Sequence, residues 1–140
     1  MQQQTFDRSA EDLGNSIHLE HVNVQVPDQR LATLFYVTGL GLTRDPYLMV
    51  SDSNMWVNVG RSQFHLPTGA AQVLRGHTGL VISGRRALLD RLASVAKKLE
   101  GTAFSFREMP PALQSVITEM QSHPAGQFAL RIYRDHRAGH

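Results

Sequence analysis

Apolar and polar residues alternate along residues 17–28, IHLEHVNVQVPD, and this alternation predicts a β-strand. Side chains in a strand point to opposite faces in turn, so the two faces of this strand differ in chemistry. One face carries three valines and can lie under a helix, while the other carries His21, Asn23 and Gln25. A weaker copy of the pattern, GHTGLVIS, occupies residues 76–83 and again has a histidine near its start.

The spacing of apolar residues changes to a helical period after this strand. Residues 29–38 are predicted to form a helix whose apolar side chains recur three and four residues apart. Asp28 can cap its first turn, and Gly39 can end it in a left-handed conformation. Three further strands are predicted, over residues 42–50, 55–59 and 62–66, the last two as a hairpin.

The same order of elements occurs again in the second half of the chain. A helix with a clear apolar stripe is predicted over residues 85–99. The predicted strands around it cover residues 77–82, 103–107, 113–120 and 127–133. This internal repeat predicts an α+β fold in which two βαβββ modules form one curved, eight-stranded mixed sheet with the helices on its outer face. The inner face would then form a cup for a small ligand.

The length of the chain, 140 residues, is typical of one globular domain with a proper core. We expect a flexible N-terminal lead over residues 1–15, a single domain over residues 16–134 and a flexible tail over residues 135–140. Within the domain, the first module is predicted over residues 16–67 and the second over residues 76–134.

Composition narrows the classes of function. The chain has no cysteine, which removes disulfides, thiolate metal sites and cysteine nucleophiles. Its formal net charge is +2 and its basic residues are dispersed, so we expect no nucleic-acid partner. The N-terminal residues lack the pattern of a signal peptide, and no apolar run reaches the length of a membrane span. The protein is therefore predicted to be cytoplasmic, with no membrane association.

The polar residues expected to face the cup are the candidates for contact with a small-molecule ligand. The predicted ligand-binding residues are Asn23, Gln25, Gln63 and Arg131. If Arg131 points into the cup, its guanidinium would favour an anionic ligand; if it points outward, it is a solvated surface residue. The large side chains of the hairpin are predicted to serve packing rather than contact with a ligand. They are Met55, Trp56 and Phe64.

Five segments, in the right order and spacing, resemble the vicinal oxygen chelate superfamily, also called the glyoxalase, bleomycin-resistance and dioxygenase superfamily. They are HVNVQVPD, LFYVTGLGL, MWVNVGRSQFHLP, GHTGLVIS and HPAGQFALRIY. The resemblance spans residues 17–133 and implies the paired βαβββ fold. It also implies a divalent metal at the mouth of the cup (Zn, Fe, Ni or Mn) and a homodimer.

Carried over by position, the resemblance assigns metal ligands to His21, His65 and His77. Many members of the family supply a carboxylate from the eighth strand. Here that position falls on Leu130, or on Arg131 if the hairpin shifts by one residue, and neither side chain binds a metal. Three neutral imidazoles can still hold a divalent transition metal and leave positions open for a substrate.

The sequence leaves more than one function open. The first is a metal-dependent lyase, isomerase or dioxygenase that acts on a small oxygen-rich molecule, with its catalytic residues unassigned. The second is a non-catalytic protein that sequesters a small ligand without a metal, and the missing carboxylate favours this function. The third is a structural or regulatory domain whose cup stays empty.

Overall fold

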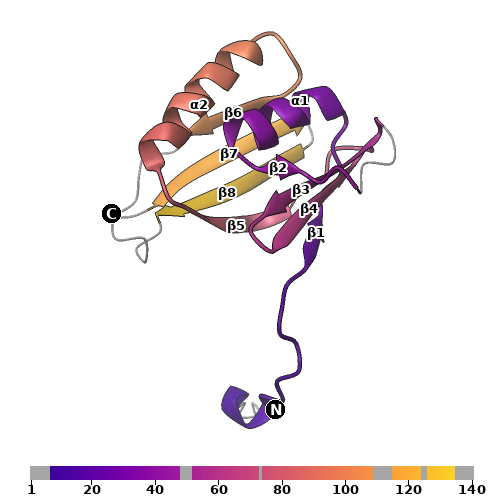
Figure 1. Cartoon of the computed structure of the whole chain (residues 1–140), viewed down its shortest axis with the longest axis vertical. Coiled ribbons are helices and arrows are strands. Elements are labelled where there is room, and N and C mark those ends of the chain that lie inside the picture. Colours follow the sequence, from indigo (N-terminus) through magenta and orange to yellow (C-terminus); the bar gives the residue numbers. More distant parts are fainter. Residues whose placement is uncertain (1–6, 48–51, 73, 109–114, 124–125, 135–140) are drawn as a thin grey trace, which may run out of the picture.

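The computed structural model describes residues 7–47, 52–72, 74–108, 115–123 and 126–134. These residues form an α+β fold with two four-stranded sheets, and both main helices lie on the same side of them (Figure 1). The fold class and the mixed character of the sheets confirm the sequence-based prediction. A single hydrogen-bonded sheet of eight strands stays a prediction, since the described pairings make two sheets of four.

The first sheet has the strand order β1-β4-β3-β2. Strand β1 runs parallel to β4, and the other neighbours are antiparallel. The elements of this half are β1 (His21–Asn23), α1 (Gln29–Thr33), η2 (Leu34–Gly39), β2 (Thr43–Arg44), β3 (Asn54–Val59) and β4 (Ser62–Pro67).

The second sheet has the strand order β5-β8-β7-β6, which repeats the order of the first. Strand β5 is again parallel to its neighbour β8, and the other pairs are antiparallel. The elements are β5 (Leu74–Ile82), α2 (Arg85–Lys98), β6 (Ser105–Glu108), β7 (Ser115–His123) and β8 (Gly126–Arg134).

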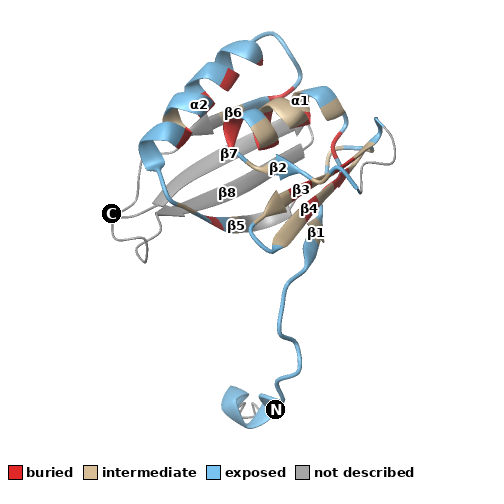
Figure 2. Cartoon of the chain, viewed as in Figure 1, coloured by how far each residue is buried: buried red, intermediate tan, exposed pale blue. Residues whose placement is uncertain are grey.

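The core lies between the helices and the sheets, and Figure 2 marks buried positions on both α1 and α2. Helix α2 packs against η2, and Phe35 of η2 contacts the rings of Phe104 and Phe106 at centroid distances of 5.4 and 5.2 Å. Phe35 is fully buried. Its removal from water, worth roughly 1.5–3 kcal/mol, therefore stabilises a contact between the two halves of the chain.

Helix α1 begins as predicted, because the Asp28 side chain accepts a hydrogen bond from the Leu31 backbone N–H at 3.0 Å. Its end differs from the prediction. The chain continues through the π-helical segment η2, and the left-handed residue is Gly41, with φ +82°. Gly39 is instead buried against α2, where an added Cβ would meet Leu92 Cδ2 at 3.1 Å. The helical segment does end at Gly39, but the left-handed conformation predicted for Gly39 was wrong.

Two predicted strands are shorter than expected. Only His21–Asn23 forms a regular strand within residues 17–28. Val26 adds an isolated bridge to Thr68, and the residues before the strand are exposed and lead into an arm that runs away from the sheets (Figure 1). Strand β2 covers only Thr43–Arg44 and is followed by a turn at residues 46–47. Residues 48–51, where that strand was expected to continue, are outside the described part.

None of the helices among the described residues is long and apolar enough to cross a membrane.

Candidate functional site

One face of the first sheet carries most of the candidate residues. In β3 and β4, buried residues such as Val57 and Phe64 alternate with half-buried residues that point away from the helices. The register pairs His21 with Gln63 across β1 and β4. We call this side of the sheet the polar face and define it by five side chains: His21, Trp56, Asn58, Gln63 and His65.

Three rings of the polar face form an aromatic cluster. Trp56 stacks on His65 with ring centroids 4.0 Å apart and planes inclined by 10°. His21 meets the indole edge-to-face at 4.9 Å, and its centroid lies 6.4 Å from that of His65. Met55 and Phe64 are buried in the core, and Trp56 packs on the polar face. Alternation along β3 was the signal that could have placed Trp56 there.

Hydrogen bonds fix the orientation of both imidazoles. His65 Nε2 lies 2.7 Å from Asn54 Oδ1, and His21 Nδ1 lies 3.0 Å from Glu20 Oε2. Partial burial, and to a smaller extent the charge of nearby His21, lower the pKa of His65 below its ordinary value of 6.5. The cluster therefore favours a neutral ring at His65.

A chain of side-chain amides holds the other end of the polar face. Gln63 Nε2 donates to Asp45 Oδ2 at 2.9 Å and to Asn58 Oδ1 at 2.8 Å. Asn58 Nδ2 in turn donates to Thr43 Oγ1 at 3.3 Å. This network orients the Gln63 amide, since both of its hydrogens have acceptors.

A cavity of about 180 Å³ opens where β1 and β4 meet β5. We call it the seam cavity, because it lies between the inner edges of the two sheets. Its polar lining comes from His21, Ser62, Gln63 and Thr78, and most of its remaining surface is aliphatic or aromatic. No Lys, Arg, Asp or Glu among the described residues lines it.

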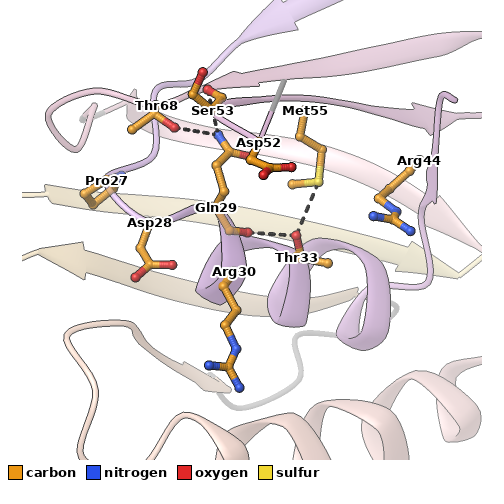
Figure 3. Close-up of a pocket in the computed structure, with 10 residues that line it drawn as sticks. All are labelled: Pro27, Asp28, Gln29, Arg30, Thr33, Arg44, Asp52, Ser53, Met55 and Thr68. Carbon is orange, nitrogen blue, oxygen red and sulfur yellow. Dashed lines mark hydrogen bonds between the residues drawn. The ribbon is translucent and has the colours of Figure 1, made fainter. Parts of the chain in front are cut away.

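A wider hollow of about 640 Å³ lies on the helix side of the same sheet (Figure 3). We call it the helix-side hollow; four charged residues line it: Asp28, Arg30, Arg44 and Asp52. In its wall, Gln29 Nε2 donates to Leu66 O at 2.7 Å and to Thr68 Oγ1 at 3.1 Å. Among the residues whose side chains are described, none predicted to bind a ligand or a metal lines this hollow.

The predicted ligand-binding residues are divided between several places. Gln63 lines the seam cavity, and Asn23 is exposed on β1 in register with His65. Gln25 lies against Gly69, where an added Cβ would meet Gln25 Oε1 at 2.7 Å, and it does not line the seam cavity. Arg131 pairs in register with Gly79, but its side chain is outside the described residues.

The predicted metal ligands do not form a metal site within the described part of the chain. His21 and His65 share the polar face, whereas the side chain of His77 is outside the described residues. Leu130 pairs in register with Thr78, so the eighth strand offers no carboxylate there. No group of three or more His, Cys, Asp or Glu side chains among the described residues could hold a metal ion. A metal held with the help of His77 stays a prediction.

Comparison with solved structures identifies the fold. Lactoylglutathione lyase from Agrobacterium tumefaciens is 16% identical, with 91% of this chain and 100% of that chain covered and a TM-score of 0.53. The fosfomycin resistance protein FosX from Mesorhizobium loti is 17% identical, with coverage of 82% and 91% and a TM-score of 0.53. A candidate glyoxalase family protein from Bacillus anthracis is 14% identical, with coverage of 86% and 99% and a TM-score of 0.56.

Comparisons by sequence gave a different result. No family model matches the chain, and no curated protein matches it. The likeness therefore concerns the fold, and at this level the resemblance found in the sequence is confirmed: the chain has the fold of the glyoxalase, bleomycin-resistance and dioxygenase superfamily.

Proposed function

We propose that the protein binds a small molecule in the seam cavity and sequesters it without changing it. The observation that carries the proposal is that two residues predicted from the sequence, His21 and Gln63, line one cavity together. Each is held by a hydrogen bond to a carboxylate, from Glu20 and Asp45 respectively. Preorganised polar groups in a mostly apolar cavity are typical of small-molecule sites.

The arrangement of the two sheets supports the same proposal. Strands β1 and β5 are the inner edges of the sheets, and both line the seam cavity. We infer that the sheets act together as one cup with the polar face as part of its wall. A homodimer, a cytoplasmic location and the absence of a nucleic-acid partner stay predictions.

A second candidate is an enzyme that moves a proton. His21 lines the cavity and its Nδ1 contacts the Glu20 carboxylate, an arrangement that orients the imidazole. In this function His21 would take a proton from the bound molecule. Recovery of the ligand in a changed chemical form would favour this second function over sequestration.

The test is a search for small ligands with Trp56 as reporter, since Trp56 is the only tryptophan and lies beside the site. Val59→Phe and Val22→Phe each place a larger side chain in the seam cavity. We expect both variants to abolish binding of the ligands that shift Trp56 fluorescence. The matched control Arg44→Phe narrows the helix-side hollow and should leave binding intact. The proposal would be overturned by ligands that still bind to both seam-cavity variants but no longer bind to the control variant.

A further inference from the structure

We propose that the seam cavity selects neutral molecules that carry an N–H or O–H donor on a small apolar ring. This inference rests on the proposed function and specifies its ligand. The reason is that the described polar side chains of the cavity, with the exception of Thr78, have already given their donor hydrogens to partners within the protein. What they present to a ligand is therefore mainly lone pairs.

Gln63 is the best-defined acceptor in the cavity. Both hydrogens of its amide group are used, one towards Asp45 and one towards Asn58. Its carbonyl oxygen, Oε1, has no hydrogen-bond partner within the described part of the chain. Because the Asp45 carboxylate polarises the amide from the other side, this oxygen is a strong acceptor for a ligand donor.

His21 and Ser62 present acceptors for the same reason. An ionised carboxylate only accepts, so the contact between His21 Nδ1 and Glu20 places the hydrogen on Nδ1. When the ring is neutral, the other nitrogen, Nε2, then carries a lone pair. Ser62 Oγ donates to the Leu19 carbonyl oxygen at 2.6 Å and keeps its own lone pairs free.

The charges around the cavity exclude ions of both signs. With His21 neutral, an anion would meet three acceptors, two of them backed by carboxylates, and no Lys or Arg side chain among the described lining residues. Arg61 is the sequence neighbour of Ser62 but does not line the cavity. A cation would lose its hydration in a mostly apolar cavity whose lining includes no carboxylate in the described residues.

The volume sets the size of the ligand. An apolar cavity of about 150 Å³ can hold a benzene molecule. The seam cavity, at about 180 Å³, therefore has room for one six-membered ring with a small substituent. Phenol, toluene and benzoate form a matched series, because they share the ring and differ in a donor, a methyl group and a negative charge.

The experiment titrates the full chain with each of the three compounds and follows binding by the NMR signals of His21 and Ser62. We expect phenol to bind about tenfold more tightly than toluene, the size of one net hydrogen bond, and benzoate to cause no shift at the same concentrations. In Gln63→Met, phenol affinity should fall to about that of toluene, whereas toluene affinity should not change. Ser62→Ala, a smaller change, should reduce the phenol preference in part.

The outcomes separate this inference from the function on which it rests. If phenol and toluene bind equally, or if benzoate binds more tightly, selection for a donor is overturned. The seam site itself is retained in that case, provided that Val59→Phe still abolishes binding. Binding that Val59→Phe does not affect, or no binding of any of the three compounds, overturns the seam site itself. Loss of the phenol preference in Gln63→Met with unchanged toluene binding supports both.

Discussion

The two faces of the first sheet have opposite properties, and β4 shows the contrast within two consecutive residues. Phe64 is 3% exposed and belongs to the core, whereas its neighbour His65 is half-buried and stacks on Trp56. The larger hollow lies on the helix side, but its charged residues differ from the preorganised groups of the seam cavity. The comparison teaches that one face holds the fold together and the other is available for recognition.

Alanine substitution at these neighbouring positions gives the largest expected difference. Phe64→Ala should lower the free energy of unfolding by about 3–5 kcal/mol, because it removes a buried ring that contacts Tyr36 at a centroid distance of 5.9 Å. His65→Ala should cost about 1 kcal/mol or less, since it removes one half-buried ring and its bond to Asn54. Urea denaturation measures both values.

Equal costs at the two positions would contradict the division between the faces. A loss of more than about 3 kcal/mol in His65→Ala would mean that the polar face also carries the core. Both variants should keep the same dependence of unfolding free energy on urea concentration, which shows that the exposed surface area on unfolding has not changed.

Removal of one atom, the hydroxyl oxygen of Tyr36, tests how the helix-side face contributes to stability. Its side chain is fully buried, and its hydroxyl group is the one buried side-chain polar atom in the described residues without a hydrogen-bond partner. Burial also raises the pKa of Tyr36 far above its ordinary value, so the phenol stays neutral. Tyr36→Phe should therefore leave stability unchanged or increase it by about 1 kcal/mol.

The matched control for this variant is Tyr47→Phe, because Tyr47 is 91% exposed and its hydroxyl group is hydrated in both the folded and unfolded states. That control should change the melting temperature very little. A loss of stability in Tyr36→Phe larger than in the control would contradict the absence of a partner for the buried hydroxyl group.

Much of this contrast could be predicted from the sequence. Alternation with a period of two placed His21 and Gln63 on polar sides of their strands, and it separated Phe64 from His65. The helix start at Asp28 followed from its capping side chain. These predictions succeeded because each depends on residues that are close in the sequence.

The rest of the site depends on contacts that a local pattern does not contain. The bond from Gln63 to Asp45 joins residues 18 positions apart, and the seam cavity needs β5 beside β1 and β4. The left-handed residue is Gly41 and not Gly39, and Gly39 lies in close contact with α2, a contact between distant segments. Long-range packing therefore decided which polar residues share a cavity.

The smallest expected effect is the dependence of the polar face on pH. Since the pKa of His65 is lowered below 6.5, the unfolded chain binds this proton more readily than the folded chain. Stability contributed by neutral His65 is therefore complete above pH 6.5 and is lost as the pH falls through the interval below it. His65→Gln should make the unfolding free energy less sensitive to pH in that interval.

Trp56 reports the same titration in the folded protein. A protonated imidazole stacked at 4.0 Å should quench the indole, so fluorescence should fall with a midpoint below pH 6.5. His21→Gln removes the smaller of the two causes of the lowered pKa and should move the midpoint upward, but not to 6.5, because burial still acts on His65. A midpoint at 6.5 in the original protein would mean that His65 is as hydrated as a free imidazole. The polar face would then be an open surface rather than the wall of a binding site.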